Sequence, residues 1–481
     1  MIRPRARERV RYDIIYGMFL KLKRVYQILL YTLLLCMGGW LFYAPMRAPL
    51  PASAEAPHLL AAAIDAEHLS LPTLPQGAQA KSVPFHRCAS AFVQFISEEH
   101  LSGYRIRTYR LFPATLSLLF LLLLPALGLK RRGGCFERED TPFWVALFTL
   151  ATPPFLCYGS LFSPLSFQAL LFLILLVAFR SYVIWPGILS TFVIAFVTIL
   201  GLTISGNILW VLLLMLPAIG VGVGWSRIKL YWRWSHVATF TTLFLTALFC
   251  GWHFGFIQAP SLPTAWPTLD GLLNAMVSRL VWLTAGGFGL VAWLGLVSWC
   301  LYHPERGWTK VFTLMYPLFF MASFGFEGGG EFTVPMICLS LILLGMALAK
   351  IPTLRIRFVI SGSALIALAI AMPRFINNHF IQTPADAQRQ IAHTLMRACK
   401  TPQAWRKVAF EIKDPTLYAT MLWPIRQCKL LPAHQSHAAE VILSDQPLTL
   451  LQRQWPTSTI QPISFSEYSM LHLIQHTPSQ P

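Results

Sequence analysis

The chain has 481 residues, of which 55% are hydrophobic and only 12% are charged. This charged fraction is about half that of an ordinary soluble protein, so it excludes a soluble globular protein and predicts a polytopic α-helical membrane protein. Lys and Arg number 38 against 20 for Asp and Glu; we assign this surplus to cytoplasmic loops and membrane lipids rather than to nucleic acid, because no basic segment is interleaved with exposed aromatic residues.

The N-terminal segment, residues 1–24, is predicted to be a basic amphipathic helix on the cytoplasmic surface of the membrane. Apolar residues recur in it at helical spacing among basic ones, at Ile14, Ile15, Met18, Phe19 and Leu22. Residues 25–43 then form a first span of about the 20 residues that a bilayer requires. A cleaved signal peptide is the alternative, because Ala52-Ser53-Ala54 resembles a cleavage site, but the apolar core is longer than the usual core of about 7–15 residues.

A polar outer loop, residues 45–110, separates this span from a second one at 111–129. Further spans are expected at 143–158, 165–179, 183–203, 208–225, 237–257, 280–302, 311–326, 334–348 and 358–372. Together they predict a transmembrane domain over 25–373 with about 11 helices, a cytoplasmic N-terminus and a C-terminus outside the cytoplasm. Basic residues such as Arg180 and Lys350 fall in the cytoplasmic turns, as this orientation requires.

Ionisable residues are nearly absent from the middle of these spans. His253 is the main exception, and it lies close to an outer end, flanked by Trp252 and Phe254. Ion-coupled transporters need ionisable groups at mid-membrane to define the ion pathway. The sequence therefore disfavours a transporter.

Residues 374–481 have the composition of a water-soluble segment, and we expect a small α/β domain on the periplasmic side. Helices are predicted at 385–399 and 416–423, and strands at 407–412 and 439–444. The nine cysteines of the chain include no CxxC pair. Cys399 and Cys428 both fall in this segment, where a disulfide between them and two separate thiols are equally compatible with the sequence.

The outer loop holds the candidate catalytic acid. Glu55 stands just before Pro57, which can open a helix over 58–69, and a carboxylate held there at the membrane surface is placed for general-base work. A solvated acid that favours the helix dipole is the alternative. His58, Asp65 and His68 would share one helix face and could meet a metal, but no fourth ligand is indicated, so we predict no cofactor.

Basic residues gather in the second half of the same loop, on the side where topology does not require them. A phosphate at the level of the lipid headgroups would attract such a cluster, and contact with anionic lipid is the alternative. The residues are Lys81, Arg87, Arg105, Arg107 and Arg110.

The order of these elements resembles the GT-C membrane glycosyltransferases of the protein mannosyltransferase and lipid A aminoarabinose transferase type. In that family a first helix is followed by an outer loop with an acidic pair, a lysine element and an Arg-Leu-Pro element at the second helix. Ala54-Glu55, Lys81-Ser82-Val83-Pro84 and Arg110-Leu111-Phe112-Pro113 match these elements in order. Ala151-Thr152-Pro153-Pro154 and Gly201-Leu202 resemble later motifs, so the resemblance covers most of the chain.

The chain also departs from the family pattern. Ala54 stands where the family has its usual catalytic aspartate, and Ser205 stands where it has a lysine. Glu327 and Glu331 occupy the late outer turn, and Ser163-Pro164 stands where relatives often keep an aspartate. These departures favour the alternative of a non-catalytic membrane protein that binds lipid or a partner on the same scaffold.

The resemblance implies an inverting glycosyltransferase of the bacterial inner membrane, which moves a sugar from a polyprenyl-phosphate donor to an acceptor glycolipid or protein on the outer face. Under this hypothesis Glu55 takes the proton of the acceptor hydroxyl. Lys81 and Arg110, helped by Arg87, neutralise the phosphate of the leaving group.

Overall fold

A computed structural model describes the chain over residues 28–29, 31–32, 34–36, 38–39, 50–51, 55–67, 69, 83–96, 106–128, 141–151, 159, 161–184, 187–204, 208–224, 234–253, 270, 308–325, 330–351, 353, 355–360, 362–363, 366, 385–401, 404–466 and 469–475. The segment 1–24, the span expected at 280–302, Lys81, Ala54 and Ser205 lie outside these residues. The spans expected at 25–43 and 358–372 are described over part of their length, where they are helical.

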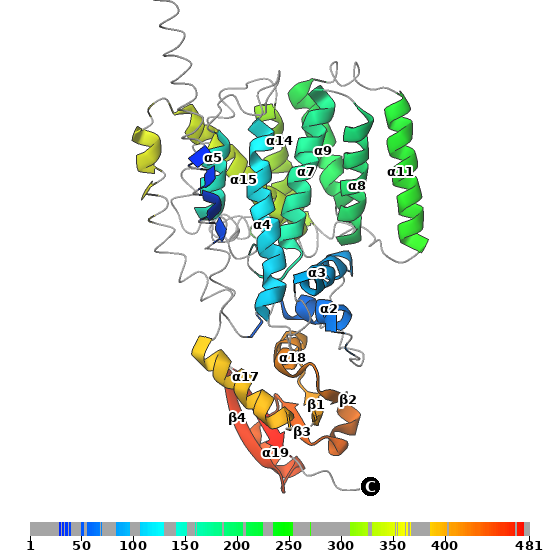
Figure 1. Ribbon diagram of the computed structural model, residues 1–481, viewed down its shortest axis with the longest axis vertical. Coiled ribbons are helices and arrows are strands. Elements are labelled where there is room, and N and C mark those ends of the chain that lie inside the picture. The colour runs from blue at the N-terminus through cyan, green and yellow to red at the C-terminus, as the bar shows by residue number, and fades with distance from the viewer. Residues whose placement is uncertain are drawn as a thin grey trace, which may run out of the picture.

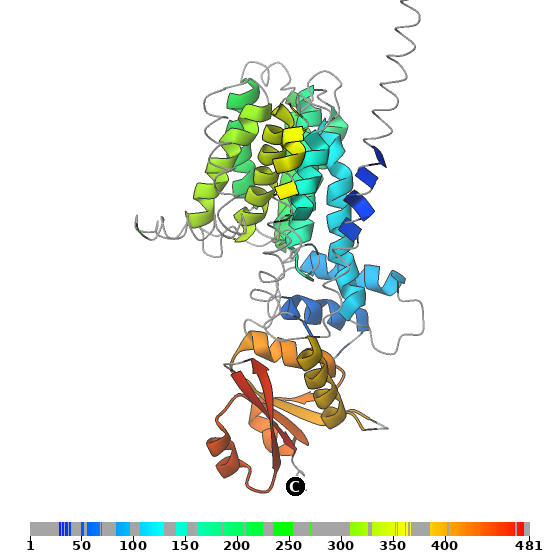
Figure 2. The same ribbon diagram turned by 90° about the vertical axis from the view of Figure 1, so that its left-hand side faces the viewer.

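A bundle of apolar helices forms one end of the molecule, and Figures 1 and 2 show its members side by side. The described members are α4 (Ile106–Gly128), α5 (Thr141–Ala151), α7 (Leu165–Ile184), α8 (Ile188–Ile204), α9 (Ile208–Val223), α11 (Trp234–His253), α14 (Trp308–Gly325) and α15 (Gly330–Lys350). Each of these helices overlaps one of the spans predicted from the sequence. By length and composition, two of them could cross a membrane, over Ile106–Leu127 (22 residues) and Leu165–Ile184 (20 residues), and shorter apolar helices cover Thr141–Leu150, Ile188–Leu202 and Val211–Val223.

Two of these helices extend into polar sequence beyond the predicted spans. Helix α4 begins at Ile106, five residues before the expected start at Leu111, because Tyr109 and Arg110 are buried against the outer loop rather than exposed to water. Helix α7 continues past the expected end, and Arg180, predicted in a cytoplasmic turn, lies inside it. Its Nη1 donates a hydrogen bond of 2.5 Å to the carbonyl of Ala126, in the last turn of α4. This arginine therefore satisfies one of the carbonyls that a helix end leaves without a partner.

Small residues let some helices of the bundle approach closely. A Cβ built on Gly345 in α15 would lie 2.4 Å from a side-chain carbon of Val145 in α5 and 2.8 Å from its backbone nitrogen. A Cβ on Gly222 in α9 would meet Val311 of α14 at the same two distances. Any larger residue at these positions would push the helix backbones apart, which is how glycine contributes to helix packing in membranes.

Two short helices, α2 (Ala56–Glu67) and α3 (Val83–Ile96), lie crosswise beneath the bundle (Figure 1). Helix α2 confirms the helix that Pro57 and the alanine-rich sequence predict. Helix α3 is not predicted, because its apolar stripe is short and lies in a loop with many polar residues. Phe85, Ala89 and Val93 form this stripe at a spacing of four residues, and all three are fully buried.

The C-terminal segment forms a mixed five-stranded sheet with helices, at the far end from the bundle (Figure 1). The strand order is β2-β1-β3-β5-β4; β1 is parallel to β2 and β3, and β5 is antiparallel to β3 and β4. The elements are α17 (Ala385–Cys399), β1 (Lys407–Glu411), α18 (Pro415–Leu422), η2 (Trp423–Ile425), β2 (Lys429–Leu431), η3 (Ala433–Ala438), β3 (Val441–Ser444), α19 (Leu448–Gln454), β4 (Thr459–Ser466) and β5 (Ser469–Gln475).

The predicted helices and strands of this segment are confirmed by α17, β1, α18 and β3, whereas β2, β4 and β5 are not predicted. Strand β2 has only three residues, too few for an alternating pattern. Strand β4 contains Pro462, which argues against a strand in the middle of a sheet. Because β4 is the edge strand, the missing N–H of this proline does not remove a bond from the centre of the sheet.

A buried ion pair joins this domain to α2. The Nε of Arg426 lies 3.0 Å from each carboxylate oxygen of Glu67, and its Nη2 lies 2.8 Å from Oε1. Tyr109 of α4 donates a hydrogen bond of 3.1 Å to the same Oε1, and its ring meets the Trp423 ring edge to face at 5.4 Å. Helices α2 and α4 and the C-terminal domain therefore share one polar contact.

Cys399 and Cys428 are free, buried thiols in the structure, so the disulfide that the sequence left open is not formed. Burial raises the pKa of the Cys399 thiol to about 12, and it also raises the pKa of the Cys428 thiol. A negative charge on Cys399 would raise the pKa of Cys428 further, and a negative charge on Cys428 would raise the pKa of Tyr418, so each of these two pairs lies close together. Neutral thiols are poor nucleophiles, so both should be inert.

We predict that Cys399 and Cys428 resist alkylation by iodoacetamide in the native protein and react fully after denaturation without a reductant. Cys88, which is exposed on α3, is the internal control and should react in the native protein. Peptide mass spectrometry distinguishes the sites. A requirement for reductant before Cys399 and Cys428 can be alkylated would show instead that they are disulfide-bonded.

Candidate functional site

Glu55 occupies the position just before α2. Its backbone carbonyl accepts the N–H of Leu59 at 2.9 Å, the first hydrogen bond of the helix, so the local structure fixes where the side chain begins. The residue is 0% exposed. A carboxylate in such a position must find hydrogen-bond donors within the protein, because water does not reach it.

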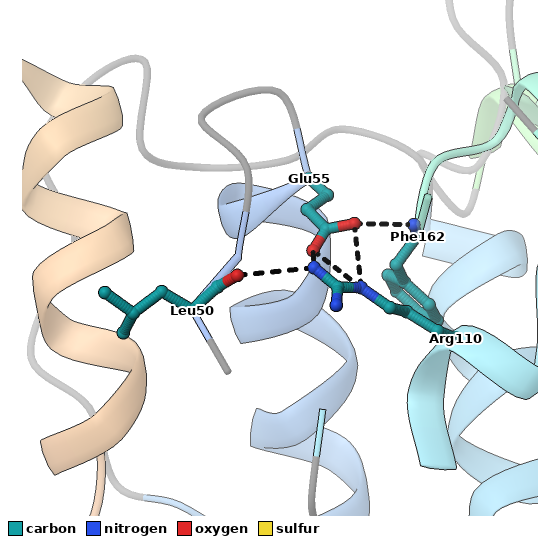
Figure 3. A network of polar contacts seen from close by, with 4 residues as sticks. All are labelled: Leu50, Glu55, Arg110 and Phe162. Atoms are coloured by element: carbon teal, nitrogen blue, oxygen red, sulfur yellow. Dashed lines mark hydrogen bonds and ion pairs between the residues drawn. The ribbon is translucent and has the colours of Figure 1, made fainter. Parts of the chain in front are cut away.

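Arg110 supplies most of these donors from the first turns of α4. Its Nε lies 3.0 Å from Oε1 and 3.4 Å from Oε2 of Glu55, and its Nη2 forms an ion pair with Oε1. The same Nη2 donates to the carbonyl of Leu50 at 3.3 Å. The backbone N–H of Phe162 donates to Oε2 at 3.0 Å, so both carboxylate oxygens accept hydrogen bonds (Figure 3).

A cluster of aromatic rings includes Phe162, whose backbone contacts the ion pair, and Glu55 and Arg110 are both buried. The Phe162 ring lies 5.1 Å from the ring of Phe85 in α3 and 5.8 Å from the ring of Tyr109 in α4. Phe85 is also 5.5 Å from Phe112, in the second turn of α4. In an apolar setting of this kind an ion pair is strong once formed, but removal of either partner leaves an uncompensated buried charge.

A pair of histidines lies between α2 and α3. The Nδ1 of His58 is 3.0 Å from the Nε2 of His86, so one imidazole donates to the other. Burial lowers the pKa of His58 to about 4. Burial, and second to it the charge on His58, lower the pKa of His86 to about 3. The pair is therefore neutral at neutral pH and holds the two helices together by an uncharged hydrogen bond.

The structure brings Glu55 and Arg110 together, as the hypothesis of a single site requires. Arg87 is exposed on α3, next to His86, whereas Glu55 and Arg110 are buried. Lys81 lies outside the described residues. Of the three possible metal ligands, His58 contacts His86, Asp65 is exposed, and His68 is not described.

The parts of the site that come from the backbone are not predicted from the sequence. The carbonyl of Leu50 and the N–H of Phe162 hold the ion pair, and no residue type is needed for either role. His86 was also missed, because its partner is 28 residues away and no spacing rule connects the two.

We predict that loss of one partner of the ion pair destabilises the protein strongly. Arg110→Met should lower the free energy of unfolding by about 3–5 kcal/mol, because it leaves the Glu55 carboxylate buried without its cation. The double variant with Glu55→Leu should lose less than the sum of the two single variants, because it buries no charge. Denaturant unfolding in detergent measures both, with Arg107→Met, exposed on the same helix, as the control. Additive losses would mean that the two side chains do not interact.

We predict a second effect from the histidine pair, on stability in acid. Because the folded pKa values lie below the ordinary value of 6.5, the unfolded chain binds more protons as the pH falls. The contribution of this pair to the free energy of unfolding is thus fully present above about pH 7, and it is lost as the pH falls from about 6.5 to about 4. The melting temperature of the His86→Gln variant should fall less than that of the wild type between pH 7.5 and pH 5. Equal falls would exclude the pair as the cause.

Comparison with protein-family models gives no match, and comparison with curated protein sequences gives none either. Comparison with solved structures gives similarity over almost the whole chain. The crystal structure of ArnT from Cupriavidus metallidurans in the apo state has a TM-score of 0.58 and 10% sequence identity, over 92% of this chain and 97% of that one. The structure of ArnT from the same organism bound to undecaprenyl phosphate has a TM-score of 0.60 and 10% identity, over 95% of this chain and 99% of that one.

At 10% identity the similarity concerns the fold and not the individual residues. It includes both the helical part and the C-terminal mixed sheet, as the coverage of the chain requires. The resemblance seen in the sequence is thereby confirmed for the architecture. The chain therefore has the fold of ArnT, although only 10% of the aligned residues are identical.

Proposed function

We propose that this protein is a membrane glycosyltransferase that transfers a sugar from a polyprenyl-phosphate donor to an acceptor glycolipid or protein. The observation that carries the proposal is the similarity in fold, over 95% of the chain, to ArnT bound to undecaprenyl phosphate. The buried carboxylate of Glu55 and the buried guanidinium of Arg110 support it, because transfer from a phosphate donor needs a proton acceptor and a cation.

In this proposal the protein crosses the bacterial inner membrane about 11 times. Residues 1–24 lie on the cytoplasmic side, 25–373 form the transmembrane domain with the outer loop 45–110, and 374–481 form a periplasmic domain. Large apolar side chains exposed on the bundle support lipid contact, because water would disfavour so many of them. They include Leu122, Phe192, Phe196, Leu213, Leu216 and Phe249, each at least 50% exposed.

The ion pair gives the proposed reaction a defined first step. A guanidinium binds a phosphate with the same planar geometry as a carboxylate, so the donor phosphate would replace Glu55 on Arg110. Lys81 and Arg87 would contribute further positive charge to the phosphate. The released carboxylate of Glu55 would then be free to accept a proton.

The bond changes of the transfer follow from this arrangement. Glu55 takes the proton of the acceptor hydroxyl, and the acceptor oxygen attacks the anomeric carbon of the sugar from the side opposite the phosphate. The bond from that carbon to the phosphate oxygen breaks, so the configuration inverts and polyprenyl phosphate leaves with its added negative charge beside Arg110.

We predict that Glu55→Gln lowers transfer by about 10²–10⁴-fold while donor binding remains. The measurement is turnover of radiolabelled polyprenyl-phosphate sugars by protein in nanodiscs, with undecaprenyl phosphate binding and the melting temperature recorded for each variant. Asp65→Asn, the same change of an acid to its amide at an exposed residue of α2, is the matched control and should behave as wild type. If Glu55→Gln does not fold, Glu55→Asp keeps the charge and tests the placement of the carboxylate. Unchanged turnover in a folded variant would remove Glu55 from the mechanism.

A non-catalytic lipid-binding protein is the second candidate, and one observation favours it. Glu55 is fully buried, and both of its oxygens accept hydrogen bonds from Arg110 or Phe162. A carboxylate held in this way can serve the fold alone. Binding of undecaprenyl phosphate without transfer of any labelled sugar to membrane extracts would support this candidate over the enzyme.

A further inference from the structure

Arg426 connects the C-terminal domain to helix α2. It directly follows η2, and both α18 and η2 pack against α2, as Figure 1 shows for α18. The Arg426 side chain is 8% exposed, and the side chain of Glu67, the last residue of α2, is 4% exposed. Two buried charges of opposite sign are therefore paired at the boundary between the domain and the outer loop.

The guanidinium of Arg426 is held by its own domain as well as by α2. Its Nη1 donates a hydrogen bond of 2.9 Å to the carbonyl of Trp423, and its central carbon lies 4.2 Å from the centre of the Trp423 ring. Its Nε and Nη2 donate to the carboxylate of Glu67. A planar guanidinium bound in this way has little freedom to rotate, so it transmits the position of the domain to the end of α2.

The packing of α2 leaves the position of its last turn to this ion pair. Contacts of Glu55 and His58 hold the start of α2, whereas Glu67 holds the last turn. Alanine side chains make low ridges, so ridge-and-groove packing restrains the sliding and tilting of an alanine-rich helix only weakly. Most of the buried residues of α2 are alanines, namely Ala56, Ala62, Ala63 and Ala66.

Loss of the Arg426 guanidinium would leave the Glu67 carboxylate beside a neutral donor, the hydroxyl of Tyr109. A buried carboxylate without its cation is strongly disfavoured, so the end of α2 would move toward water. Helix α2 has 12 residues and is about 18 Å long, so a tilt of about 5° displaces one end relative to the other by about 1.5 Å. Misplacement of reacting groups by about 1 Å can lower a rate about 10²-fold.

We propose that Arg426 is a positioning residue, which sets the place of the Glu55 carboxylate through Glu67 and the rigid helix α2. The inference rests on the proposed function, because the place of Glu55 matters to transfer only if Glu55 is the base. Arg110 lies on α4 rather than on α2, so a shift of α2 would move the base and leave the proposed phosphate site in place. Arg426 therefore affects turnover and not donor binding.

A purely structural role is the alternative, in which the ion pair only attaches the domain to the outer loop. In that case any cation at position 426 that keeps the protein folded would also keep its turnover. A lysine keeps the charge beside Glu67, but it cannot donate from two nitrogens fixed in one plane, and it loses the flat stacking on Trp423. Arg426→Lys therefore separates a role in geometry from a role in stability.

The test is the steady-state kinetics of the full-length protein in nanodiscs, with a labelled polyprenyl-phosphate sugar as the donor. We expect Arg426→Lys to lower kcat at least about tenfold and to leave the donor KM within about twofold of wild type. Arg453→Lys, exposed on α19 in the same domain, is the matched control and should behave as wild type. If Arg426→Lys does not fold, Glu67→Gln combined with Arg426→Gln leaves neither charge buried alone and should show the same loss. Wild-type kcat in the folded variant would overturn the proposal.

Hydrogen exchange tests the same link without any transfer reaction. Peptides from residues 56–62, at the start of α2, should exchange faster in Arg426→Lys than in wild type, whereas peptides from α7 remain unchanged. A wild-type protein that transfers no sugar would remove the proposed function, and exchange at 56–62 would still decide whether Arg426 fixes the start of α2. Unchanged exchange there would overturn the inference, whether or not the protein is an enzyme.

Discussion

The structure of the outer loop depends on the buried ion pair between Glu55 and Arg110. Each charge alone would be strongly disfavoured in this apolar setting, so the two side chains can be buried only together. The pair joins the start of α2 to α4, and the N–H of Phe162 adds the segment before α7. One interaction thus fixes three parts of the chain that are more than 50 residues apart in sequence. Any function placed at this site has to be compatible with that closed arrangement.

Helix α2 is held at both ends by two consecutive residues of α4. Arg110 binds Glu55 before the first turn of α2, and Tyr109 donates to Glu67 in its last turn. Side chains one residue apart on a helix point about 100° apart, so neighbouring residues can reach opposite ends of a helix that lies across them. Glu67 also binds Arg426 of the C-terminal domain. Because α2 is a single helix of 12 residues, the position of that domain and the position of Glu55 are linked through one rigid element.

The sequence predicts those features that depend on local pattern. Apolar runs identify the helices of the bundle, and alternating or amphipathic stretches identify α17, β1, α18 and β3. Glu55 and Arg110 were each chosen from the sequence, but their direct contact was not, because 55 residues separate them. The amphipathic helix α3, the neutral pair of His58 and His86 and the backbone donors of the ion pair were all missed. These features arise from tertiary packing, for which the sequence carries no periodic signal.

A carboxylate cannot remain bound to a buried guanidinium and also act as a base, and this conflict restricts the proposed mechanism. If Glu55 left Arg110 with nothing in its place, the guanidinium would be buried without an anion, at a cost of several kcal/mol. A phosphate that enters as the carboxylate leaves avoids this cost, because the guanidinium keeps a bidentate anionic partner throughout. Donor binding and release of the base are then one event, and the carboxylate becomes available only when there is a sugar phosphate to react. Under the proposed mechanism the free protein keeps Glu55 bound to Arg110, so full burial of this carboxylate in the absence of substrate is compatible with a role as base.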